Sequence, residues 1–215
     1  MSALALSIAD QAMLSERFAR AMARAGEVLG FMSGRTLTIA APDLRWATPG
    51  EIIESNGGPD QVIVGVYVGF EGPVSGHALL LLELAGARRL AQILLDGYTE
   101  PSGTALRSPT GELVLEPLEV SALQEVGNVT VSTFLNDLGQ QLAQPIHPTV
   151  PQAVVEIGGA LLDAVLMDVC SDSNEVLAAR TTFIDGDDEI EGHMLVLPRP
   201  ASLQVFIDAL GAGEQ

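Results

Sequence analysis

Residues 121–151 read SALQEVGNVTVSTFLNDLGQQLAQPIHPTVP, and they predict one long helix followed by an apolar β-strand. Ser121, Glu125 and Asn128 recur at steps of four and three residues, which places their side chains on one helix face. A carboxylate and a carboxamide one turn apart, both facing solvent, can bind a partner and orient a water molecule. The opposite side can face a core through Leu123, Val126, Val129, Phe134 and Leu138.

The composition limits the partners that this chain can bind. Its 215 residues are enough for one sizeable core, or for two small lobes that share one. The formal net charge is −18, and all ten basic residues are arginines. Such a charge argues against nucleic acid and anionic membranes, which bind to basic faces. The acidity favours a basic partner surface. A saline cytoplasm would also fit this composition, and a coding bias against lysine accounts for it equally well.

Targeting and metal signals are absent from the sequence. The single cysteine, Cys170, permits neither an internal disulfide nor a thiolate metal cluster. The N-terminus lacks a basic start and is interrupted by Asp10, unlike a signal peptide. No apolar run reaches the length of about 18 residues that a membrane-spanning helix needs. We therefore expect a soluble, cytoplasmic protein without membrane insertion and without a thiolate metal cluster.

Hydrophobic periodicity and turn residues divide the rest of the chain. Residues 43–60 are dominated by turn signals around a short helical piece at 50–54. Residues 98–116 predict a connector with one short strand at 113–115. The predicted helices are 9–33, 84–96, 117–143, 158–170 and 200–210, and the predicted strands are 36–41, 61–70, 74–82, 150–157, 175–184 and 190–197.

The chain reads as an internal duplication. Residues 9–97 and 117–211 share the order long helix, strand, variable piece, hairpin and short helix. Glu16 precedes Pro42 by 26 residues, the spacing that also separates Glu125 from Pro151. The segment VSGHALLLL at 74–82 likewise matches IEGHMLVL at 190–197. We predict one α/β layered domain over 1–215, with a pseudo-twofold axis and two long helices packed on a shared sheet.

The repeat aligns Ala12, Glu16 and Ala19 with Ser121, Glu125 and Asn128. The first half therefore keeps the acid and has lost the amide, and we interpret Glu16 as part of a degenerate site. A solvated acid is the simpler alternative for Glu16.

The pattern of Ser121, Glu125, Asn128 and then Pro151 resembles the CheC/CheX/FliY family of chemotaxis phosphatases, and the two-copy layout is most similar to CheC. The resemblance extends over nearly the whole chain, including the tract at 157–166 and the segment at 191–200. CheC commonly carries two such helices, and this chain departs from that pattern at Ala19. FliY-like proteins add a C-terminal switch domain for which this chain ends too early.

The resemblance implies a phosphatase that acts on the aspartyl phosphate of the response regulator CheY. Asn128 would orient the hydrolytic water, Glu125 would pair with the regulator's active-site lysine, and Ser121 would assist at the rim of the contact. Pro151 would shape the following strand. The regulator would supply Mg²⁺, so the resemblance implies no cofactor in this chain.

Other interpretations stay open at this point. The chain could be a non-catalytic adaptor that binds CheY or the receptor deamidase CheD, or a structural component of the flagellar switch. The equivalent histidines, His77 and His193, are more simply structural than metal-binding. The acidic turn at 185–189 is most simply a solvated hairpin tip. Gly127, inside the long helix, either admits another backbone or packs against a neighbouring side chain.

Overall fold

The computed structural model describes residues 8–41, 44–95, 105–161, 164, 176–202, 204–206 and 208. Two long helices form as the periodicity predicts, and a third follows the first β-hairpin. None of the helices in these ranges is long and apolar enough to cross a membrane. The helices are α1 (Ile8–Ser33), α2 (Pro49–Ser55), α3 (Leu84–Leu94) and α4 (Pro117–Gln141), with a 3₁₀ turn, η1 (Pro200–Ser202).

The strands form one large antiparallel sheet and a separate short hairpin. The sheet follows the order β1-β9-β10-β4-β3-β7, with β2 also paired to β9 and β8 also paired to β3. The strands are β1 (Leu37–Ala40), β2 (Leu44–Ala47), β3 (Val62–Glu71), β4 (Gly76–Glu83), β5 (Leu106–Arg107), β6 (Leu113–Leu115), β7 (His147–Pro148), β8 (Gln152–Ile157), β9 (Val176–Asp185) and β10 (Asp188–Pro198).

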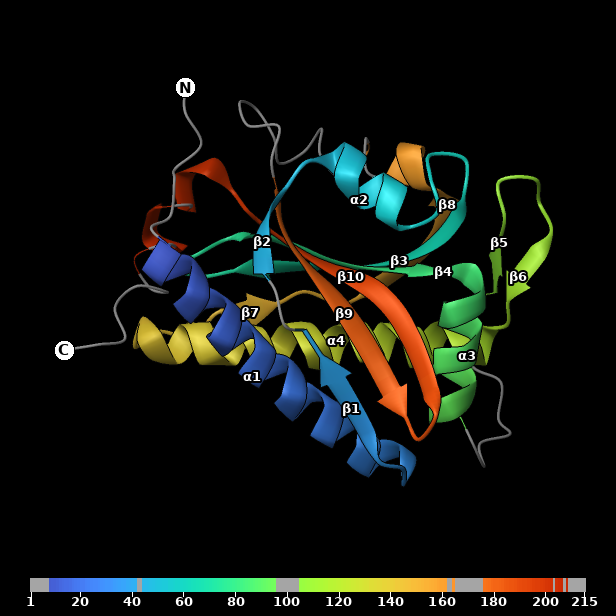
Figure 1. Cartoon of the computed structure of the whole chain (residues 1–215), viewed down its shortest axis with the longest axis horizontal. Coiled ribbons are helices and arrows are strands. Elements are labelled where there is room, and N and C mark those ends of the chain that lie inside the picture. Colours follow the sequence, from blue (N-terminus) through green and yellow to red (C-terminus); the bar gives the residue numbers. More distant parts are fainter. Residues whose placement is uncertain are drawn as a thin grey trace.

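Helices cover both faces of the sheet, so alternate side chains of the central strands enter two different cores. Figure 1 shows α1 and α4 crossing on one side of the sheet, with α2 on the other side. In β10, Met194 and Val196 join the larger core under α1, α3 and α4. Leu195 and Leu197 join the smaller core, which also holds Ile52 of α2. The predicted layered fold, with two long helices on a shared sheet, is confirmed.

Several predicted elements need correction. Strand β2 was not predicted, because its four residues show no alternation in the sequence and pair with β9, which lies 129 to 135 positions away. The predicted connector at 98–116 contains the β5–β6 hairpin within its described part. The predicted helix at 158–170 is helical at 158–161 and at 164, and its other residues lie outside the described ranges. The last predicted helix, 200–210, begins as η1 and is helical at 204–206 and 208.

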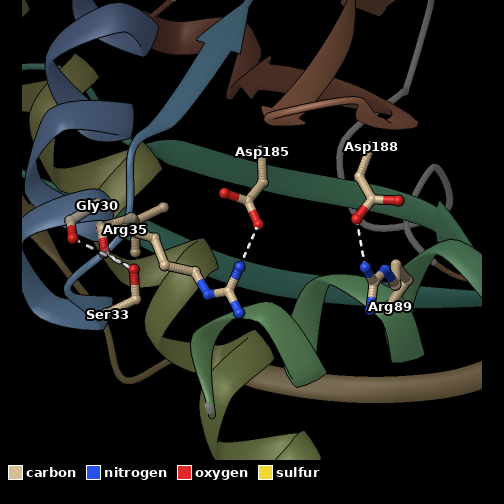
Figure 2. A network of polar contacts seen from close by, with 7 residues as sticks. Gly30, Ser33, Arg35, Arg89, Asp185 and Asp188 are labelled. Atoms are coloured by element: carbon tan, nitrogen blue, oxygen red, sulfur yellow. Dashed lines mark hydrogen bonds and ion pairs between the residues drawn. The ribbon is translucent and has the colours of Figure 1, made fainter.

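The β9–β10 turn is tighter than predicted and carries ion pairs. Asp185 and Asp188 lie opposite each other across a two-residue turn in which Gly186 adopts a positive φ of 61°. Arg35, just after α1, contacts Asp185 at 2.8 Å, and Arg89 of α3 contacts Asp188 (Figure 2). The acidic turn is therefore attached to α1 and α3, and it is not merely solvated.

Candidate functional site

The start of α4 is set by a local capping arrangement. Pro117 occupies the first turn, where its missing N–H leaves no helical hydrogen bond unmade. The Glu119 carboxylate accepts from the backbone N–H of Glu116 at 2.8 Å, which satisfies a donor at the helix N-terminus. The helix thus begins one turn before Ser121 and presents its next three turns in a defined register.

Ser121, Glu125 and Asn128 lie on the outer face of α4, each half-buried. The Ser121 hydroxyl donates to the Pro117 carbonyl at 3.1 Å. The Ser132 hydroxyl donates to Asn128 Oδ1 over 3.4 Å, one turn further along. Within the described ranges, the Glu125 carboxylate has no hydrogen bond or ion pair, and Asn128 Nδ2 has no acceptor. A carboxylate and an amide are therefore both available to a partner on this face.

The inner face of α4 packs directly against the sheet. A Cβ atom at Gly127 would lie 2.4 Å from Val66 Cγ1 of β3, so this position leaves no room for a side chain. Of the two interpretations of Gly127, the structure therefore favours packing against a neighbouring side chain. The Thr130 hydroxyl is buried and donates to the Val126 carbonyl at 2.7 Å. Close packing of this kind fixes the position of α4, and therefore of its outer face, relative to the sheet.

Gln124 is a residue of the site that the sequence analysis missed. Its Nε2 donates to the Pro151 carbonyl at 3.2 Å and so ties the helix to the residue before β8. Gln124 lies one turn before Asn128, at the edge of the same face, and that spacing was the signal that could have identified it. The proline of the sequence pattern is therefore connected to the helix through its backbone.

An apolar groove of about 450 Å³ borders the site. Ser121 and Glu125 belong to its wall, whereas Asn128 does not. The other lining residues come from the end of α1, the end of α3 and the first turns of α4, namely Leu29, Met32, Ser33, Leu94, Leu95, Leu118 and Ala122. Sequence periodicity could not identify this groove, because three separate segments form it.

The first half presents a different surface. Glu16 lies on the outer face of α1 with its side chain 75% exposed, and it pairs with Arg20 at 2.9 Å. Ala12 is exposed and Ala19 is half-buried, so neither supplies a polar group beside it. Glu16 does not line the groove. The structure thus keeps Glu16 apart from the groove that Ser121 and Glu125 share.

A polar cluster lies on the opposite face of the sheet, beside α2. Asn56 Nδ2 donates to the Ile52 carbonyl at 2.7 Å, which leaves Oδ1 to face His193 Nδ1 at 3.3 Å. His193 Nε2 lies 3.2 Å from the Ser55 hydroxyl. Burial, followed by the charge of Arg180, lowers the pKa of His193 below its ordinary value. Among the described residues, no group of three His, Cys, Asp or Glu side chains could hold a metal ion.

The sequence and the fold of this chain are similar to those of known proteins. No model of a known protein family matches the sequence. The chain is 22% identical to the CheY-P phosphatase CheC of Bacillus subtilis over 183 residues, which is 83% of this chain and 82% of that protein. The crystal structure of Thermotoga maritima FliY superposes with a TM-score of 0.73 at 16% identity, covering 98% of this chain and 100% of the chain in that structure. The chain has the fold of the CheC/CheX/FliY family.

A similar fold also occurs in FliM. FliM in the FliM–SpeE complex of H. pylori superposes with a TM-score of 0.64 at 12% identity, with 97% of each chain covered. The resemblance inferred from Ser121, Glu125, Asn128 and Pro151 is thus confirmed at the level of the fold. The fold alone does not assign an activity, so the function has to be argued from the outer face of α4.

Proposed function

We propose that this chain is a phosphatase that hydrolyses the aspartyl phosphate of a CheY-type response regulator. The observation that carries the proposal is the outer face of α4, where Glu125 and Asn128 lie one turn apart. Among the described residues, neither the carboxylate nor the amide N–H₂ has a partner. The similarity to the CheY-P phosphatase CheC supports the same activity. Because the face lies on a rigid helix packed on the sheet, it can enter a partner's site without reorganising.

The chemistry requires little from this chain beyond positioning. In phosphoryl transfer, catalysis comes mostly from alignment and from electrostatic stabilisation of the transferring group. The water oxygen attacks phosphorus, the bond between phosphorus and the aspartyl oxygen breaks, and the aspartate leaves as a carboxylate. Mg²⁺ and a lysine on the regulator would stabilise the phosphoryl charge. The phosphatase then has to place one water in line with the breaking bond.

Asn128 suits the water-orienting role. A carboxamide is neutral at all relevant pH values and can both accept and donate hydrogen bonds. Ser132 occupies one acceptor position of Oδ1, and a second lone pair remains for a water molecule. Glu125 would form a charge-assisted contact with the regulator's lysine and set the approach of the helix. Ser121, whose hydroxyl is directed to its own helix, would assist only at the rim.

The decisive experiment measures decay of a phosphorylated CheY-type regulator from the same genome, with and without this chain. Asn128→Ala should lower kcat by about a hundredfold, since a positioned catalytic group contributes about that much. Binding of the regulator should stay within a factor of two. Asn136→Ala, on an exposed turn of the same helix, is the matched control and should retain full activity. Full activity in Asn128→Ala would refute the water-orienting role.

Binding of the regulator without any acceleration would instead support the adaptor function. In that case Glu125 would be a docking residue, and binding of CheD to the same chain would be the next measurement. The proposed activity places the chain in the cytoplasm, where phosphorylated regulators occur.

The duplication of 9–97 and 117–211 within one domain is also part of our proposal, and three observations support it. In the sheet, β1 and β2 of the first half pair with β9, which belongs to the hairpin of the second half. In the same way, β7 and β8 of the second half pair with β3 of the first half's hairpin, and the β4–β10 pair lies at the centre. Gly30 and Gly139, 109 positions apart, each accept a backbone hydrogen bond five residues on, from Arg35 and Gln144. A Cβ at either glycine would lie within 3.0 Å of the carbonyl oxygen of that same residue.

A further inference from the structure

We propose that the groove between α1, α3 and α4, with the exposed end of α1 beside it, is the surface on which the phosphorylated regulator docks, and that Phe31 is its principal anchor. This inference rests on the proposed phosphatase function and extends it to partner recognition. Figure 1 shows the three contributing helices meeting at one end of the molecule, away from α2.

The end of α1 exposes an unusual concentration of apolar surface. In the described part of the chain, seven large apolar side chains are exposed, and three of them lie within five residues of α1. Phe31 is 90% exposed, Met32 48% and Val28 45%. We call these three residues the apolar rim. Their spacing of three and four residues places them side by side on the helix. Clustered exposed apolar side chains of this kind mark surfaces that bind a partner.

The rim adjoins the groove at Met32, whereas helix geometry turns Phe31 about 160° away from the lining residues Leu29 and Ser33. A partner that binds both therefore has to cover the groove and also the outer side of the end of α1. Met32 belongs to the rim and also lines the groove. The polar hydroxyls in the wall are turned to the backbone, since Ser33 donates to the Leu29 carbonyl at 2.9 Å and Ser121 to that of Pro117. Among the described residues of the lining, Glu125 is the single charged side chain. The surface is therefore apolar with one carboxylate at its edge.

Ion pairs connect the helices that form the groove to neighbouring elements in the free protein. Arg35 and Arg89 connect the end of α1 and the middle of α3 to Asp185 and Asp188 of the same β-turn (Figure 2). Arg24 of α1 lies 3.5 Å from the carboxylate of Asp137 in α4. A preformed surface loses less conformational entropy on binding than a flexible one.

The position of Glu125 identifies the occupant. A regulator whose lysine reaches Glu125 covers the groove at the same time, because Ser121 and Glu125 form part of its wall. The partner should therefore present an apolar patch next to its phosphorylation site. A second copy of this chain is a poorer occupant, because each copy carries a net charge of −18 and the two would repel each other.

The test separates binding from chemistry. Phe31→Ser should raise KM for the phosphorylated regulator by about tenfold, as expected for loss of an aromatic anchor, while kcat at saturation stays within a factor of two. The Kd for the beryllofluoride-activated regulator should rise in parallel. Val205→Ser is the matched control, since Val205 is 40% exposed and belongs neither to the rim nor to the groove. Thermal unfolding of Phe31→Ser should match that of the unchanged chain, because the side chain is almost wholly in solvent.

Each outcome has a distinct meaning. If the unchanged chain does not accelerate decay, the phosphatase function fails. If it does, but KM and Kd are unaffected by Phe31→Ser, the docking surface is wrong and the function stands. If the unchanged chain is a dimer by light scattering and Phe31→Ser makes it a monomer with KM unaltered, the occupant is a second copy and our inference is overturned.

Discussion

The outer faces of α1 and α4 carry the same acid in two different settings. Glu125 of α4 is half-buried beside an amide and has no partner among the described residues, whereas Glu16 of α1 projects into solvent and pairs with Arg20. The residue four positions after Glu125 is Val129, so no arginine can neutralise the α4 carboxylate from the next turn. The same residue type on two helices thus does not make the same site, because the neighbouring residues decide whether its charge is available to a partner.

The two long helices pack on the sheet through different residues. In the duplication that we propose, with its shift of 109 residues, Gly127 of α4 would correspond to Phe18 of α1. Gly127 packs against Val66 of the sheet, whereas the Phe18 ring contacts the ring of Phe134 in α4, with centroids 5.3 Å apart. Both helices are seated on strands, since a Cβ at Gly26 of α1 would lie 2.8 Å from the backbone nitrogen of Ile39 in β1. The two helices also pack against each other through the rings of Phe18 and Phe134.

The largest expected effect tests the packing of α4 on the sheet at Gly127. Gly127→Leu should lower the free energy of unfolding by about 3 kcal/mol, because a side chain forced against Val66 overpacks the interface. Urea denaturation would measure the loss. Asn136→Leu adds the same side chain on an exposed turn of α4 and should change stability by less than about 0.5 kcal/mol. Equal stability of the two variants would mean that α4 can lift from the sheet.

The next effect compares the two acids directly. Glu125→Gln should raise KM for the phosphorylated regulator by about tenfold, since it removes the charge from a charge-assisted contact. Glu16→Gln should leave KM within a factor of two, because Arg20 already engages that carboxylate. Steady-state kinetics of both variants would decide. Equal effects in the two variants would show that the first half also binds the regulator.

The smallest effect concerns the buried histidine on the other face. Burial and Arg180 depress the pKa of His193 in the folded state, while Glu191 opposes this shift and Arg45 adds to it. The unfolded chain therefore binds the proton more readily, and stability is lost as the pH falls below about 6.5, the ordinary histidine value. Urea midpoints between pH 7.5 and 5.5 should decline more steeply for the unchanged chain than for His193→Gln. Parallel declines would show that His193 does not titrate differently on folding.

Local patterns predicted much of the fold. The three- and four-residue steps of apolar residues predicted α1 and α4 almost to their ends, and alternation with glycine and proline turns predicted the β3–β4 and β9–β10 hairpins. The same steps predicted that Ser121, Glu125 and Asn128 share one face, because a helix has a fixed period. Strand β2 escaped prediction, since four residues carry too little pattern and depend wholly on β9 for pairing.

Contacts between segments that lie far apart in the chain could not be predicted from the sequence. The groove joins Leu29, Leu95 and Leu118, and the ion pairs of Arg35 and Arg89 reach across 150 and 99 positions. Gln124 reaches the carbonyl of Pro151, a bond between a side chain and a backbone group that residue types do not reveal. Periodicity encodes which face of an element is buried, but not which element buries it. The sequence alone therefore determined the two long helices, the β3–β4 and β9–β10 hairpins and the polar face. The tertiary structure decided that Glu125 has no partner among the described residues, that Glu16 is paired and that an apolar groove adjoins the site.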